Sequence, residues 1–76
     1  MTTVEYIDKN RRFVQESKQA IDALILDAET RGSVFITMNE YISTDTGGKD
    51  VFRETGVNFN QIARFYDPVI EEEEGI

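Results

Sequence analysis

Apolar residues in the first 31 positions recur at the spacing of one face of an α-helix. Thr2 and Glu5 have the spacing of a capping box, in which the side chains satisfy the first amides of a helix. No Gly or Pro occurs between residues 3 and 31, and Gly32 stands where a C-cap glycine is expected. The pattern predicts one helix over residues 3–31, about 43 Å long at 1.5 Å per residue. Its apolar stripe consists of Val4, Ile7, Val14, Ile21, Leu24, Ile25 and Ala28.

The pattern changes to strand-like alternation after Gly32. Residues 33–42 are rich in β-branched and aromatic side chains, and this predicts a strand. A short helix after Thr37 is the alternative, because Thr37 and Glu40 also have capping-box spacing. The pair Gly47-Gly48 fits the turn of a hairpin, and residues 51–55 fit either its second strand or a helical turn.

Helical spacing returns after Asn58, a suitable N-cap residue, and Pro68 should end regular helix near Tyr66. The four adjacent carboxylates of residues 71–74 repel one another, so residues 71–76 are expected to be disordered in the free protein. The chain is therefore predicted to be a single α+β domain over residues 1–70. It has a long N-terminal helix, a central strand or hairpin and a C-terminal amphipathic helix; an all-α fold is the alternative. The last helix has the apolar residues Phe59, Ile62, Ala63, Tyr66, Val69 and Ile70.

Composition excludes several functions. The 76 residues include no Cys and no His, which rules out disulfides, thiol redox chemistry, Cys/His zinc sites and imidazole-based catalysis. Apolar runs are too short for a membrane helix, and the N-terminus has no secretory pattern, so a cytoplasmic protein without membrane attachment is expected. The net charge of −7 disfavours direct binding to nucleic acid and favours partners with a basic surface.

Two possible ligand sites fail on their spacing. Residues 46–49, Thr-Gly-Gly-Lys, lack the preceding Gly and the following Ser or Thr of a phosphate-binding loop. Asp45 and Asp50, or the glutamates of residues 71–74, do not follow a calcium-loop pattern. We therefore expect no cofactor, no metal and no enzymatic activity.

Residues 51–65 resemble a helix-turn-helix, with Gly56 at the turn and Val57 directly after it. Phe52 departs from the motif, which has a small residue at that place, and no basic face is present. The resemblance implies a DNA-binding regulator as an alternative function. Its base-contacting candidates are Asn58, Asn60, Gln61 and Arg64.

Aromatic residues near the C-terminus precede most of the acidity. Residues 1–66 hold 10 acids and 8 bases (−2), whereas residues 67–76 hold 5 acids and no base (−5). Aromatic anchors beside charge are common at protein interfaces, which predicts a localised partner-binding site here. Its candidate residues are Phe59, Phe65, Tyr66, Asp67, Glu71, Glu72, Glu73 and Glu74.

In size, acidity and lack of catalytic residues, the chain resembles the small inhibitors carried by phages, including anti-CRISPR proteins and DNA mimics. The resemblance implies inhibition or modulation of a host nucleic-acid-binding protein, in the host cytoplasm, by carboxylates that stand in for phosphates. The predicted function is thus non-enzymatic protein binding. A further alternative is a structural or assembly subunit that forms a homodimer through the long N-terminal helix.

Overall fold

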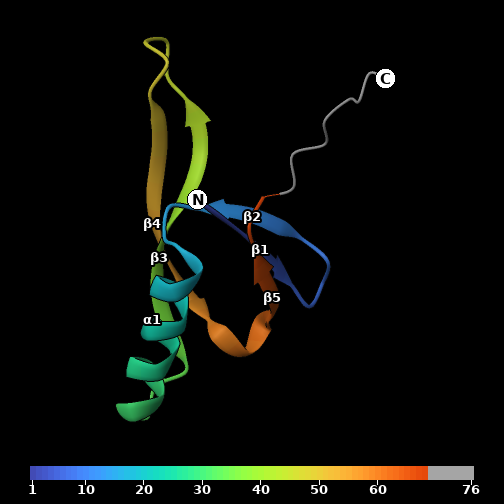
Figure 1. The fold of residues 1–76 in the computed structure, drawn as a ribbon, viewed down its shortest axis with the longest axis vertical. Helices are drawn as coiled ribbons and strands as arrows, with labels where there is room; N and C mark the ends of the chain where they lie inside the picture. The colour runs from blue at the N-terminus through green and yellow to red at the C-terminus, as the bar shows by residue number, and fades with distance from the viewer. Residues whose placement is uncertain (69–76) are drawn as a thin grey trace.

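A computed structural model describes residues 1–68 of the chain. Within these residues, five antiparallel strands form one sheet in the order β4-β3-β2-β1-β5, and the single α-helix packs on one face of it (Figure 1). The predicted arrangement of a long N-terminal helix, a central strand or hairpin and a C-terminal helix is therefore wrong, and so is the all-α alternative. The elements are β1 (Thr2–Tyr6), β2 (Arg11–Val14), α1 (Lys18–Thr30), β3 (Phe35–Thr44), β4 (Asp50–Asn58), the 3₁₀ turn η1 (Phe59–Gln61) and β5 (Ile62–Tyr66).

The first half of the predicted N-terminal helix is a β-hairpin. Residues 2–6 include three β-branched side chains and alternate between the two faces of the sheet, which favours a strand. Lys9 has φ of 76°, a left-handed conformation that reverses the chain between β1 and β2. Glu5, predicted to belong to a capping box with Thr2, instead lies opposite Arg11 across the hairpin. Helical spacing and strand alternation both place Val4 and Val14 on one face. Periodicity alone therefore did not distinguish a helix from a hairpin here.

The helix begins at residue 18, where Ser17 caps it. The Ser17 hydroxyl accepts a hydrogen bond from the Ala20 amide at 3.1 Å, the usual role of an N-cap serine. The second half of the predicted stripe is confirmed: Ile21 and Ala28 are fully buried against the sheet. Leu24 and Ile25 pack at the edge of the same cluster. The buried core consists of Val4, Val14, Ile21, Ala28, Ile36 and Met38.

The strand predicted over residues 33–42 is present as β3, and it forms a long hairpin with β4. Its turn lies where Gly47-Gly48 predicted it: Gly48 has φ of 85°, and the Asp45 carboxylate accepts hydrogen bonds from two turn amides. A register shift between Tyr41 and Ser43 bends β3. Beyond this bulge the hairpin extends past the rest of the sheet (Figure 1).

The predicted C-terminal helix is also wrong. Asn58 does cap a turn, since its side chain accepts a hydrogen bond from the Asn60 amide at 2.8 Å, but this turn is a 3₁₀ turn of three residues. Residues 62–66 then pair with β1, whose second edge is otherwise open. The β1–β5 ladder satisfies backbone groups and buries Phe65 beside Val4. Residues 51–65 therefore form a strand, a turn and a strand, and they contain no helix-turn-helix.

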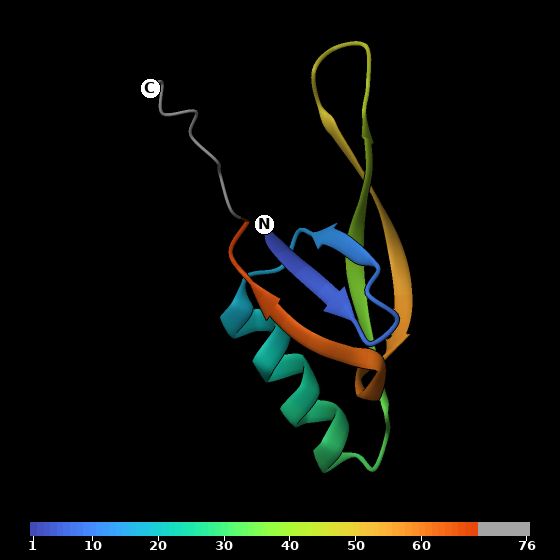
Figure 2. The same ribbon diagram turned by 90° about the vertical axis from the view of Figure 1, so that its right-hand side faces the viewer.

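The sheet has two parts that meet at one short junction, as the views in Figures 1 and 2 show. Between β2 and β3 the ladder has one register pair, Val14 with Glu40. Glu16, just before the helix, reinforces the junction. Its carboxylate accepts hydrogen bonds from the Asn39 amide at 3.0 Å and the Asn39 side chain at 2.9 Å, and its carbonyl accepts one from the buried Thr2 hydroxyl at 2.7 Å.

Candidate functional site

The face of the sheet opposite α1 carries most of the aromatic side chains. Because β-strand residues alternate, the neighbours of the core residues Val4, Val14, Ile36 and Met38 point to this opposite side. Five of the eight aromatic residues lie there, and the buried core contains none. We call this side the open face; Figure 2 looks onto it at β5, β1 and β2. Its residues are Thr3, Glu5, Arg11, Phe13, Phe35, Thr37, Asn39, Tyr41, Phe52, Glu54, Gly56, Asn58, Arg64 and Tyr66.

The aromatic residues of the open face are partly accessible to solvent. Phe13 is 44% exposed and Phe35 is 59% exposed. Tyr41 and Phe52 stack edge to face across the β3–β4 hairpin, with ring centroids 6.0 Å apart. An antiparallel sheet with one solvated face normally shows polar residues on that face, so the number of aromatic side chains here is unusual. Such a surface is characteristic of an interaction site.

Two arginines share one carboxylate at the centre of β5, β1 and β2. Glu5 lies opposite both Arg11 and Arg64 in the sheet register. Its Oε1 atom is 3.4 Å from Nε of Arg11 and 3.1 Å from a terminal nitrogen of Arg64. The Arg64 guanidinium also stacks 5.5 Å from the centre of the Tyr66 ring. Both arginine side chains remain more than 60% exposed, so they present positive charge at the surface.

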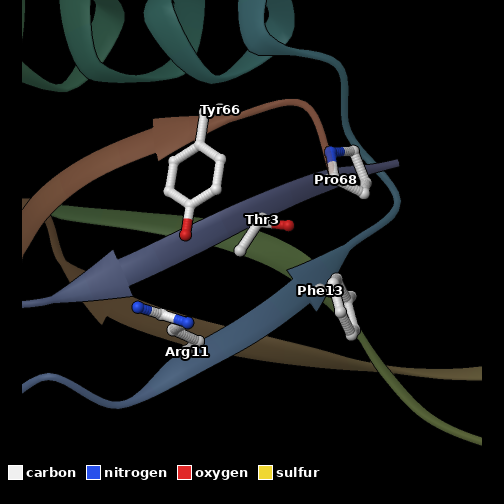
Figure 3. A pocket seen from close by; sticks show the side chains of 5 residues that line it. All are labelled: Thr3, Arg11, Phe13, Tyr66 and Pro68. Atoms are coloured by element: carbon white, nitrogen blue, oxygen red, sulfur yellow. The ribbon is translucent and has the colours of Figure 1, made fainter. Parts of the chain in front are cut away.

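A groove crosses this part of the open face (Figure 3). One cavity of about 200 Å³ is lined by Thr3, Arg11, Phe13, Tyr66 and Pro68, and Thr3 is only 5% exposed at its floor. A second cavity of about 430 Å³ is lined by Arg11, Arg64, Phe65 and Tyr66. The two cavities are adjacent, because Arg11 and Tyr66 line both. We call the combined feature the arginine–aromatic groove.

The arginines also set the protonation of Glu5. Partial burial raises the pKa of the Glu5 carboxyl, but the hydrogen bond and charge of Arg64, together with Arg11, outweigh it. The net effect lowers the pKa of Glu5 below its usual value. Glu5 is therefore ionised at neutral pH.

Acidification is expected to weaken this cluster. A lowered pKa in the folded state contributes stability above the unfolded glutamate value of about 4.3, and this stability is lost as the pH falls through the folded value. The difference in melting temperature between wild type and Glu5→Gln should therefore shrink below about pH 4.3. Leu26→Ser, at an exposed position of α1 that carries no ionisable group, is the control, and its difference should stay constant. A Glu5→Gln difference that is the same from neutral to acidic pH would contradict the assignment.

A second ionic cluster lies on the helix side of the sheet. Glu40 is 3.1 Å from Arg12 and 3.6 Å from Arg53, and its side chain is only 15% exposed. Burial, followed by the charge of Glu40, raises the pKa of the Tyr6 hydroxyl, against the opposing effect of Arg12. Together with the pairs Arg31–Asp27 and Lys18–Asp67, six of the eight basic residues form ion pairs. The four acids in these pairs, Glu5, Asp27, Glu40 and Asp67, are neutralised by basic side chains. They are therefore poorly suited to imitate the phosphates of nucleic acid.

The predicted partner-binding residues are separated by the fold. Phe59 and Phe65 pack against the core on the helix side, and Asp67 is 3.1 Å from Lys18. Tyr66 lies in the arginine–aromatic groove. The predicted residues Glu71, Glu72, Glu73 and Glu74 lie outside the described residues.

The predicted DNA-contacting residues do not share a recognition helix. Asn58 caps the 3₁₀ turn, Asn60 is exposed on it, and the Gln61 carbonyl accepts a hydrogen bond from the Ile7 amide. Arg64 instead belongs to the open face. Sequence reasoning missed Arg11 and Phe13, because it assigned both to a helix that does not form; their alternation with Arg12 and Val14 was the available signal.

Comparisons with known proteins give no match: no family model, no curated protein and no solved structure is similar to this chain. Within residues 1–68, no group of three or more acidic side chains is placed to hold a metal ion. No helix in this part of the chain has the length and apolarity needed to cross a membrane. The site must therefore be interpreted from its own residues.

Proposed function

We propose that this protein is a non-enzymatic binding protein whose open face contacts a partner protein. The observation that carries the proposal is the gathering of five aromatic side chains and two exposed arginines on the sheet face that no helix of residues 1–68 covers. Tyr, Phe and Arg are the residue types enriched in protein interfaces, and Tyr and Arg are common among those that dominate binding energy.

The charge of the open face favours a protein partner over nucleic acid. Its four ionisable acids and bases, Glu5, Glu54, Arg11 and Arg64, sum to zero. Nucleic-acid binding without sequence preference depends on several Lys or Arg contacts to phosphates, which this face does not offer. A neutral aromatic surface is suited to burying area against another protein.

The acidic C-terminal residues support a partner with a basic surface. Pro68 lines the arginine–aromatic groove, and the sequence after it carries four glutamates and no basic residue. These carboxylates come soon after Pro68 in the sequence, and they would add long-range attraction to lysines and arginines around the contact. Basic surfaces occur on nucleic-acid-binding proteins, so we propose that this protein inhibits or modulates a partner of that class.

Affinity capture from extract of the native host tests the proposal. Wild-type protein should retain a partner, and the double variant Phe13→Ser/Tyr66→Ser should bind that partner about 30-fold more weakly, the effect expected for an interface hot spot. Raising the salt concentration should also weaken retention, since exposed charges are screened.

Leu26→Ser is the matched control, because Leu26 is 65% exposed on the outer side of α1. It should retain the partner as wild type does, and thermal melts should show that all variants are folded. Equal loss of binding in the control and the double variant would reject the open face as the interface. A melting temperature that rises with protein concentration would instead indicate that a second copy covers this face.

A further inference from the structure

We infer that the arginine–aromatic groove is a subsite for an acidic segment of the partner, in which an aspartate or glutamate stands beside an apolar side chain. This inference rests on the proposed function and specifies the chemistry of one part of its interface. The groove joins two different surfaces: the guanidinium groups of Arg11 and Arg64, and the side chains of Phe13, Tyr66 and Pro68. Figure 3 shows these residues except Arg64.

The arginines retain hydrogen-bond donors that Glu5 does not use. A guanidinium carries five N–H donors in a planar fork. Arg64 directs Nε and one terminal nitrogen to a single oxygen of Glu5, at 3.2 and 3.1 Å, and the shortest approach of Arg11 to that oxygen is 3.4 Å, from Nε. Within residues 1–68, the terminal nitrogens of Arg11 donate no hydrogen bond, and Arg64 uses two of its three side-chain nitrogens on Glu5. Two positive charges thus face one negative charge.

Glu5 also holds the two arginines in position. Because its side chain is only 13% exposed and lies between them, it fixes both Nε atoms on the same oxygen. The stacking of Tyr66 on Arg64 further restricts that guanidinium. A fixed pair of guanidiniums with unused donors is suited to donating a bidentate pair of hydrogen bonds to a carboxylate.

The rest of the groove is suited to an apolar side chain next to that carboxylate. Tyr66 and Phe13 rise on either side of Thr3, which forms the floor, and Pro68 closes one end (Figure 3). Contact with these rings would bury apolar area close to the charged hydrogen bonds, where exclusion of water strengthens them. The occupant that fits both parts is a short acidic and apolar peptide segment.

A nucleic-acid strand fits the groove less well. Residues 1–68 hold 11 acids and 8 bases, a net charge of −3, and the groove offers two cations for a ligand with a phosphate at every nucleotide. Arg11, Arg64 and Glu5 together carry one net positive charge, which is enough to balance the single negative charge of one carboxylate.

Titration of the full-length protein with acetyl-glutamyl-phenylalanine amide, followed by NMR of the arginine Nε–H signals, tests the inference. We expect saturable shifts of the Arg11 and Arg64 signals. The glutaminyl analogue of the peptide and the variant Arg11→Gln should each bind at least about tenfold more weakly, as expected for loss of a charge-assisted hydrogen bond. The titration is repeated in a variant with residues 71–74 changed to glutamine, which removes the chain's own carboxylates as competitors.

Arg31→Gln is the control, because Arg31 is a similarly exposed arginine, paired with Asp27 at the end of α1. It should bind the peptide as wild type does. Three results would each overturn the inference. The first is the absence of shifts in both the wild type and the glutamine variant, and the second is that Arg31→Gln weakens peptide binding as much as Arg11→Gln does. The third is that oligothymidylate binds more tightly than the peptide. If the peptide fails while Phe13→Ser/Tyr66→Ser still loses the captured partner, the groove chemistry is wrong and the proposed function stands.

Discussion

Replacing Ile21 with alanine should destabilise the protein by about 3 kcal/mol, within the range for deleting a fully buried aliphatic side chain. Ile21 is 0% exposed and is the largest fully buried side chain, at the contact between α1 and the sheet. Within residues 1–68, only six apolar residues are buried. Because this core is small and closely packed, few side chains can shift to fill the cavity that the substitution leaves. Urea denaturation followed by circular dichroism measures the free energy of unfolding.

Leu26→Ala is the control for this substitution, because Leu26 is in the same helix but 65% exposed. It should change the free energy of unfolding by less than about 0.5 kcal/mol, as surface substitutions usually do. A small domain has a thin stability margin, so Ile21→Ala should be partly unfolded even without denaturant. Similar effects for the two substitutions would show that α1 does not pack on the sheet through Ile21.

Glu16→Ala should cost about 2 kcal/mol, because it leaves the Asn39 amide and side chain without their charged acceptor at the junction of the two parts of the sheet. Glu16→Gln should cost less, since its carbonyl oxygen can still accept one of these hydrogen bonds. Hydrogen exchange should locate the effect: the amides of β3 near Asn39 should exchange faster, and those of α1 should change less.

Glu29→Ala is the control, because Glu29 is exposed on α1 and its side chain forms no ion pair within residues 1–68. It should leave the exchange of the β3 amides unchanged. If Glu16→Ala has no effect on stability or on β3, the connection between β2 and α1 does not hold the junction.

Local signals in the sequence predicted some elements correctly. The apolar spacing of Ile21, Ile25 and Ala28 lies within α1, and the β-branched run before Ile42 lies within β3. Gly47-Gly48 predicted the turn of the hairpin, and Asn58 predicted a cap. In each case the residue determines backbone conformation through its own geometry or a hydrogen bond to a near neighbour, so no distant contact was needed.

The two wrong helices have a common cause. At both ends of the chain, the apolar residues fit a helical stripe and a strand alternation almost equally well, as Val4 and Phe65 illustrate. These two residues lie opposite each other in the β1–β5 ladder, although 61 positions separate them in the sequence. Pairing of the two termini supplies the hydrogen bonds of both strands, and a one-dimensional pattern contains no information about that pairing.

The candidate site could not be predicted for the same reason. Arg11, Arg64 and Glu5 come from three strands, and their proximity is a property of the sheet register. Three predicted site residues line the groove: Phe65 and Tyr66 from the partner-binding prediction, and Arg64 from the DNA-binding alternative. The two aromatic residues were found because an aromatic residue beside an acidic run is a local signal.

By itself, the sequence determined the absence of thiol and imidazole chemistry, the concentration of acidity after residue 66, the central helix and the β3–β4 turn. These properties depend on residue type or on near neighbours along the chain. The tertiary structure decided that residues 2–6 and 62–66 are strands, that Glu5 and Glu40 each pair with two arginines, and that five aromatic residues share one face. Each of these depends on which strands pair and in which register. Within residues 1–68, α1 is the one helix available to cover a sheet that has two faces.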